Sequence, residues 1–202
     1  MNSPILIDLF AEDRAHEEFL KAMINRIAKE ETKEVSLQIR SARGGHGRVL
    51  NELSIYQKAV LHSESSLLRM PDLLIVAIDA NCRNFNEARQ EIEKALEKSF
   101  LYRTIIACPD PHVERWYLAD PDSLKKVIGV GPKVGRKKCE RGYYKSILSK
   151  AIIDAGYPPT LGGIEFAREI VENMDFYRAR KGERSLNHFL NAAIPSIRSM
   201  QV

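Results

Sequence analysis

Cysteine is scarce in this chain of 202 residues: only Cys82, Cys108 and Cys139 occur, and no two of them form a Cys-x-x-Cys motif. The scarcity excludes a small scaffold held together by disulfides, and the spacing does not support a zinc site. Long hydrophobic runs are also missing, because the longest, residues 73–78, is far short of the roughly 20 residues that a membrane-spanning helix requires. We therefore expect reduced thiols in a cytoplasmic protein with no membrane span.

Internal repeats, low-complexity tracts and a secretory leader are likewise missing from the pattern. The first apolar stretch meets Asp8 at once, which is not the pattern of a signal peptide. Hydrophobic residues make up 44% of the chain and charged residues 29%, as in ordinary globular proteins, so wholesale disorder and fibrous architectures are not expected. The length allows one large domain, or one domain of roughly 150 residues with an appendage.

Short strand patterns alternate with amphipathic helix patterns in the first part of the chain. The strand patterns cover residues 4–10, 34–39, 73–78 and 104–108. Helical spacing of apolar residues marks residues 14–30, 48–62 and 85–96. Parallel strands need long crossover connections of this kind, so the pattern predicts a three-layer α/β fold with a mostly parallel, Rossmann-like sheet of four strands.

A helical region follows the last predicted strand. Asp110 and Asp120 each precede a proline, which is the pattern of an N-cap followed by proline at the first helical position. We expect Ser185 to cap a last helix that Pro195 ends. Two more helices are predicted, over residues 144–155 and 164–174. The fold prediction is therefore completed by a helical C-terminal extension.

The net charge of +4 is small, but its distribution along the chain is uneven. Residues 1–124 hold 16 Lys+Arg and 20 Asp+Glu, for a net charge of −4, whereas residues 125–202 hold 15 and 7, for +8. We expect the first segment to form the α/β domain and the second a basic helical region packed on it. Such a split is expected when carboxylates bind a metal ion and a basic surface receives a polyanion, although chance also produces it fairly often.

Polar side chains follow three of the predicted strands, where ligands of an open parallel sheet gather. In chain order they are Glu12 and Asp13, then Asp79 and Asn81, then Asp110, His112 and Glu114. Carboxylate oxygens are the ligands that Mg²⁺ prefers, with water and phosphate oxygens completing its octahedron. The sequence therefore predicts a site for Mg²⁺ (or Mn²⁺) at this edge of the sheet.

Each of these residues also has a purely local explanation. Acidic residues such as Glu12 and Asp13 are favoured in the first turn of a helix by the helix dipole. Asp79 and Asn81 suit a tight turn after a strand, and Asp110 suits an N-cap. The coincidence at three strand ends is what favours the metal site over these local roles.

Three segments carry a resemblance to a known family. Residues 9–20 (LFAEDRAHEEFL) place Glu12 between an apolar strand and an acidic helix start, and residues 73–81 (LLIVAIDAN) end on Asp79 and Asn81. A weaker match is residues 109–118 (PDPHVERWYL). Together they resemble the TOPRIM fold, as found in the nuclease part of OLD-type proteins and in RloB-like bacterial defence proteins.

The resemblance implies roles for the matching positions. Glu12 would be a metal ligand or a general base, and Asp79 would hold Mg²⁺, with Asn81 in place of the family's second aspartate. Glu114, with Asp110, would supply the charge that Asn81 lacks. The family likeness thus implies a metal-dependent nuclease that cleaves phosphodiester bonds of DNA or RNA and acts beside a partner ATPase.

Two basic segments could hold phosphate groups. The first is a glycine loop flanked by arginines; it is neither a Walker A motif nor a dinucleotide fingerprint, yet its backbone amides and side chains suit a phosphate. Its candidate contacts are Arg43, Gly45, His46 and Arg48. The second lies within residues 133–145, where basic residues alternate with two tyrosines, as in nucleic-acid binding. Its candidate contacts are Lys133, Arg136, Lys137, Lys138 and Arg141.

Two other functions fit the same residues. The chain could be a non-catalytic module that binds nucleic acid or a partner protein, with Asn81 as the sign of a degenerate metal site. Alternatively, the glycine loop could bind a mononucleotide in a switch domain. The nuclease hypothesis differs from both in requiring the side chains of Glu12, Asp79 and Glu114 to converge in one cleft.

Overall fold

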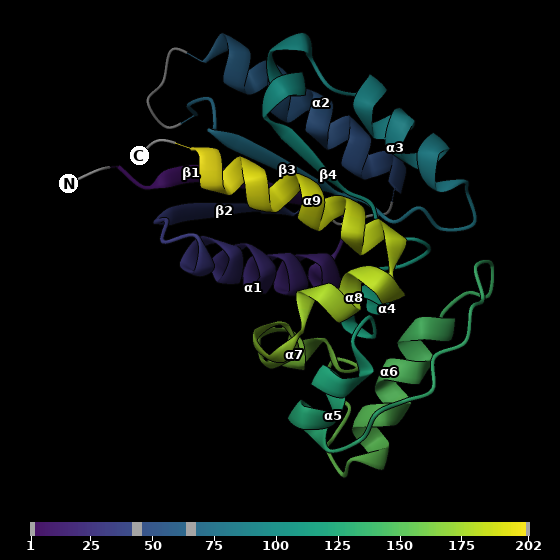
Figure 1. Cartoon of the computed structure of the whole chain (residues 1–202). Helices are drawn as coiled ribbons and strands as arrows, with labels where there is room; N and C mark the ends of the chain where they lie inside the picture. The colour runs from purple at the N-terminus through teal and green to yellow at the C-terminus, as the bar shows by residue number, and fades with distance from the viewer. Residues whose placement is uncertain (1–2, 42–45, 64–67, 201–202) are drawn as a thin grey trace.

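The computed structural model describes residues 3–41, 46–63 and 68–200. Its centre is a sheet of four parallel strands in the order β2-β1-β3-β4 (Figure 1). The strands are β1 (Ile5–Ala11), β2 (Val35–Ser41), β3 (Leu73–Ala77) and β4 (Thr104–Ala107). All four strand predictions are confirmed, and so is the three-layer α/β fold with a helical C-terminal part.

The strand sequences reflect where each strand lies in the sheet. Every residue of the two central strands β1 and β3 is buried, which explains their nearly continuous apolar runs. The edge strand β2 alternates apolar and polar residues, and its Ile39 remains 39% exposed. Ala11 of β1 is paired with Ala77 of β3, so these two strands end side by side.

Helices cover both faces of the sheet (Figure 1). Helices α1 (Arg14–Glu30) and α9 (Arg184–Ser199) lie on one face, where Ile7 and Ile75 join the same buried cluster as Phe19 and Phe189. Helices α2 (His46–His62) and α3 (Phe85–Lys94) cover the other face. The C-terminal helix α9 is therefore part of the layered core, because it packs on β4 and α1.

The remaining helices are short. They are α4 (Glu114–Tyr117), α5 (Pro121–Ile128), α6 (Tyr143–Asp154), α7 (Ala167–Asn173) and α8 (Phe176–Gly182), with 3-10 turns at Lys98–Arg103 and Ile164–Phe166. Figure 1 shows α5 and α6 away from the sheet, below α1 and α7. Trp116 and Tyr117 of α4 are fully buried and connect these helices to α1 through contacts with Phe19. Within the described residues, no helix has both the length and the apolar character needed to cross a membrane.

Three details of the helical region differ from the sequence predictions. No helix begins at Asp110, because α4 starts only at Glu114. The cap of α9 is Glu183, whose side chain accepts a hydrogen bond from the backbone nitrogen of Ser185. Pro195 lies inside α9 instead of ending it; the loss of one backbone hydrogen bond is tolerated because Ile197, two residues beyond, is buried in the core.

Helix α8 was not expected from the sequence. Its N-cap is Asp175, whose carboxylate accepts hydrogen bonds from the backbone nitrogens of Tyr177 and Arg178. Asp120 precedes α5 as predicted, but its side chain does not cap that helix and instead binds Arg178 and the backbone nitrogen of Asp175. The buried carboxylate of Asp120 thus joins α5 to α8.

Candidate metal centre

Glu12 and Asp79 meet at the carboxyl edge of the sheet, directly beyond β1 and β3. The backbone nitrogen of Glu12 donates to the carbonyl of Ala77, 3.1 Å away, which continues the pairing of the two strands by one residue. A Glu12 carboxylate oxygen in turn accepts a hydrogen bond from the backbone nitrogen of Asp79, also at 3.1 Å. The parallel strand pair therefore brings these two carboxylates together, as expected for residues at the ends of neighbouring strands.

His16 is the third member of this cluster. Asp13 caps helix α1 by accepting from the backbone nitrogen of His16, and this cap places the imidazole one turn into the helix, above the strand ends. The ring nitrogen Nε2 lies 3.0 Å from Oδ1 of Asp79, and Nδ1 lies 2.8 Å from Oδ1 of Asp13. Ligand atoms of Glu12, His16 and Asp79 all lie within 4.8 Å of one another.

The loop after β4 closes the other side of Asp79. Nδ1 of His112 lies 3.1 Å from Oδ2 of Asp79, so the two carboxylate oxygens contact two different histidines. Two backbone hydrogen bonds hold this loop on the turn after β3: Ala80 donates to Pro109 at 2.8 Å, and Asn81 donates to Pro111 at 2.9 Å. The two strand ends thus form one connected unit.

Asn81 serves the turn after β3. Its backbone is left-handed, with a φ of 55°, a conformation in which asparagine is enriched. Its side-chain nitrogen donates to the carbonyl of Asp79 at 3.3 Å. The side chain is therefore engaged by its own turn and is not among the three residues whose ligand atoms cluster.

Glu114 and Asp110 lie at the same edge but have different surroundings. Burial raises the pKa of the half-buried Glu114, and the negative charges of Asp79 and Asp13 raise it further, so Glu114 senses the cluster electrostatically. Asp110 instead forms an ion pair with Lys138, with 2.6 Å between Oδ1 and Nζ. Asp110 is thereby directed to the basic loop.

The charges within the cluster are strongly coupled. Burial raises the pKa of Glu12, the charge of His16 opposes this, and the carboxylate of Asp79 raises it further. Although burial opposes it, hydrogen bonds from His16 lower the pKa of Asp13 to about 2. Burial also disfavours the charged form of His16, yet the flanking Asp79 and Asp13 carboxylates raise its pKa well above the usual range. A divalent cation at this point would relieve the repulsion between Glu12 and Asp79.

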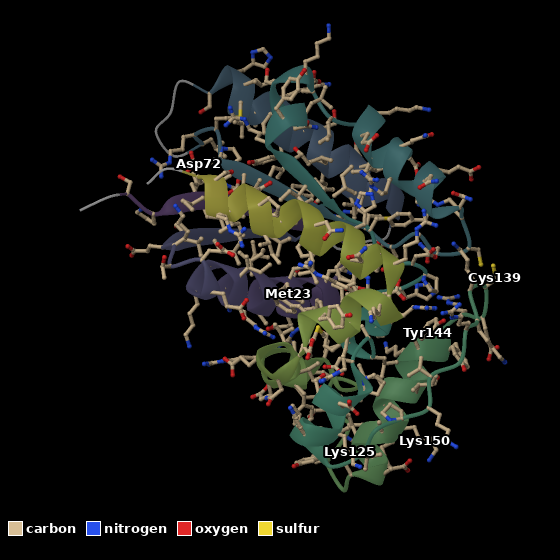
Figure 2. The ribbon with its side chains drawn as sticks, viewed as in Figure 1. Met23, Asp72, Lys125, Cys139, Tyr144 and Lys150 are labelled. Carbon is tan, nitrogen blue, oxygen red and sulfur yellow. The ribbon has the colours of Figure 1, made fainter. Side chains whose placement is uncertain are left out.

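The basic loop between α5 and α6 is anchored close to this edge. The hydroxyl of Tyr144 accepts from the backbone nitrogen of Lys137 at 3.1 Å and from Arg115 at 2.8 Å, and Arg115 is paired with Glu183. Figure 2 shows Tyr144 on α6 beside the loop that carries Cys139. Apart from Lys138, the candidate phosphate contacts of this loop are exposed, namely Lys133, Arg136, Lys137 and Arg141. The loop therefore presents positive charge next to the acidic cluster.

The glycine loop can be followed only in part. Arg43 and Gly45 lie outside the described residues, and His46 is the first residue of α2. Arg48, in the first turn of that helix, donates to Glu52 one turn later at 2.7 Å. Arg48, a predicted phosphate contact, is thus paired with a carboxylate of its own helix.

His16 is the functional candidate that our sequence reasoning missed. It lies in the first turn of α1, three residues after the N-cap Asp13, so a histidine this close to the end of the first strand was the usable signal. The role of His112 depends on the approach of the β4 loop to Asp79, which no local pattern indicates.

The fold and the site together define a class: an α/β protein with a parallel sheet whose carboxyl edge carries a cluster of histidine and carboxylate side chains. The chain belongs to the family described as a domain of unknown function (DUF4276), whose sequence profile matches residues 11–192. This match includes Glu12, His16 and Asp79, and also the first part of helix α9. Comparison with curated proteins and with solved structures finds no match.

Proposed function

We propose that this protein is a TOPRIM-like, divalent-metal-dependent hydrolase that cleaves phosphodiester bonds of nucleic acid. The observation that carries the proposal is the contact between Glu12 and Asp79 at the ends of two neighbouring parallel strands. The resemblance of both motifs to TOPRIM nucleases supports the same assignment. A partner ATPase is proposed on this resemblance alone.

Glu12 and Asp79 would hold the metal ion, with Glu114 adding negative charge from α4. Mg²⁺ or Mn²⁺ bound there would polarise the phosphodiester and lower the pKa of a water molecule. Glu12 is suited to accept the proton of that water through the carboxylate oxygen that does not bind the ion. We assign to His112, half-buried and bonded to Asp79, the return of a proton to the leaving oxygen.

The basic loop would hold the nucleic-acid strand. Its exposed residues Lys133, Arg136 and Arg141 suit backbone phosphates, and the pair of Lys138 with Asp110 holds the loop against the acidic edge. Binding of this kind is dominated by released counterions and weakens steeply as salt is raised. We therefore expect DNA or RNA to bind across the loop with the scissile phosphate near Asp79.

The test is cleavage of end-labelled DNA and RNA in the presence of Mg²⁺ or Mn²⁺. We expect Glu12→Gln and Asp79→Asn each to reduce the rate by at least about 100-fold, because loss of a metal ligand costs at least as much as loss of its supporting partners. Glu87→Gln makes the same change at an exposed position on α3 and should leave the rate unchanged. Full activity in both site variants would rule out the hydrolase.

One observation favours a second candidate, a non-catalytic module that binds nucleic acid. Asn81 brings no charge to the site, and its amide is bonded within its own turn. Binding without cleavage, unaffected by Glu12→Gln and lost when Arg136 and Lys137 are changed to Gln, would select this candidate over the hydrolase.

A further inference from the structure

We propose that His16 is a metal ligand through Nε2, and that the site therefore selects a divalent transition-metal ion such as Mn²⁺ over Mg²⁺. The inference rests on the proposed metal-binding function of the same site and deepens it by naming the class of ion. It concerns a side chain that lies outside the ligand set which the TOPRIM resemblance implies.

The imidazole of His16 lies where it can reach an ion bound to the two carboxylates. His16 is fully buried, comes from a helix that follows one site strand, and directs Nε2 at the carboxylate of Asp79, 3.0 Å away. Two ligands of one ion lie at most about 4.4 Å apart when each bond is close to 2.2 Å. Because the three ligand atoms here already lie within 4.8 Å of one another, small side-chain adjustments bring them onto a single ion.

A hydrogen bond at the other ring nitrogen holds the imidazole in place. Metal-bound histidines usually donate the other ring nitrogen to a carboxylate, which fixes the tautomer and orientation of the ring. Nδ1 of His16 has such a partner in Asp13, at 2.8 Å, and Asp13 is itself fixed as the N-cap of α1. A metal ion that displaces the proton between Nε2 and Asp79 leaves the other proton on Nδ1, bonded to Asp13, and then receives the lone pair of Nε2.

The other oxygen ligands predicted from the sequence are not directed at this point. The amide of Asn81 is directed to its own turn, and Asp110 is paired with Lys138. Glu114 is not among the residues whose ligand atoms cluster. The third group in contact with the carboxylates is therefore a nitrogen. Imidazole suits transition metals such as Fe, Ni and Zn, whereas Mg²⁺ keeps to oxygen ligands. Mn²⁺ is a transition metal that also suits carboxylates. A set of two carboxylates and one imidazole therefore favours a transition metal such as Mn²⁺ over Mg²⁺.

The experiment is pulsed electron paramagnetic resonance of Mn²⁺ bound to the full chain, with calorimetric titration of Mn²⁺ and Mg²⁺. We expect a ¹⁴N coupling from a directly bound imidazole in the wild type, and a Kd for Mn²⁺ at least about tenfold below that for Mg²⁺. His16→Gln should abolish the coupling and bring the two constants within about threefold of each other. His62→Gln, at an exposed position on α2, should change neither.

If His16→Gln does not fold, His112→Gln keeps the inference testable, because Mn²⁺ bound to that variant should retain the nitrogen coupling. Bound Mn²⁺ without nitrogen coupling, tighter binding of Mg²⁺, or no binding of either ion would overturn the inference. These results separate it from the proposed function: a nitrogen-coupled ion in a protein that cleaves no nucleic acid supports the ligand and contradicts the hydrolase. Mg²⁺-dependent cleavage without nitrogen coupling supports the hydrolase and contradicts the role of His16 as a ligand.

Discussion

Asp79 is the residue on which the site converges. Glu12 binds its backbone nitrogen, His16 and His112 contact its two carboxylate oxygens, and Asn81 binds its carbonyl. A residue with so many polar partners is held in one orientation, which is what a metal ligand requires. The same contacts show why Asn81 is better suited to shaping the turn than to binding an ion.

The role of Asn81 can be tested with two substitutions. Asn81→Gly keeps the left-handed backbone and should leave the Mn²⁺ affinity within about threefold of wild type, because the side chain is not a ligand. Asn81→Val, which is strained at a φ of 55°, should lower the free energy of unfolding by about 1–2 kcal/mol. Calorimetry and urea denaturation measure the two effects. A large loss of metal affinity in Asn81→Gly would show that the amide ligates the ion.

Among the helices, α5 and α8 are joined by one buried carboxylate. Asp120, before α5, accepts two hydrogen bonds from Arg178 of α8, at 3.0 and 3.1 Å, and one from the backbone nitrogen of Asp175 at 2.8 Å. The side chain of Asp120 is 1% exposed and that of Arg178 is 43% exposed. Because α8 directly precedes α9 in the chain, this connection links α5 to the helix that covers the sheet.

We expect Asp120→Asn to lower the free energy of unfolding by about 1–2 kcal/mol, since a buried acceptor of several hydrogen bonds is lost while part of the ion pair faces solvent. Burial opposes ionisation of Asp120, but the bonds from Arg178 and Asp175 hold its pKa below the usual range. Its stabilising effect is therefore complete above the ordinary aspartate value of about 3.9 and is lost as the pH falls through the folded pKa.

Urea denaturation of wild type and Asp120→Asn between neutral pH and pH 3 measures this dependence. The difference between the two proteins should shrink as the medium becomes acidic. Asp154→Asn is the matched control, because Asp154 forms a solvent-exposed pair with Lys150 on α6. An equal loss of unfolding free energy in both variants would show that the buried carboxylate of Asp120 stabilises the fold no more than an exposed one.

At the scale of the whole molecule, the acidic edge of the sheet and the basic loop lie next to each other although they are far apart in the chain. Lys138 reaches Asp110, and the side-chain hydrogen bond between Cys82 and the neighbouring Cys139 raises the pKa of the Cys82 thiol. Cys82 follows Asn81 directly, so the loop borders the turn that carries Asp79. The acidic first part of the chain and the basic second part thus contribute neighbouring surfaces in the folded protein.

The placement of the loop predicts a disulfide between Cys82 and Cys139 on mild oxidation. Both thiols are exposed, and treatment with oxidised glutathione should remove one hydrogen from each while reducing the glutathione to two thiols. Peptide mapping by mass spectrometry would identify the bridge. Cys139→Ser should prevent it, and Cys108→Ser, at a buried position, should not. A wild-type protein in which both thiols stay unlinked would contradict this arrangement of the loop.

The strands and their faces were predictable because they depend on local patterns. Apolar runs such as residues 73–78 belong to strands buried on both faces, and long helical crossovers require parallel pairing. The helix predictions failed where tertiary contacts outweigh local signals. Pro195 does not end α9, since the helix continues to the buried Ile197, and Asp110 starts no helix, since it is bonded to Ser185 and Lys138.

The pairing of Glu12 with Asp79 follows from the sequence alone, because carboxyl ends of neighbouring parallel strands meet at one edge. The remaining members of the site were decided by the tertiary structure. His16 reaches Asp79 only because Asp13 caps α1 at that position, and His112 does so only because the β4 loop is bonded to the turn after β3. Local patterns determine which residues lie at a strand end, whereas contacts between elements distant in the chain determine which side chains converge there.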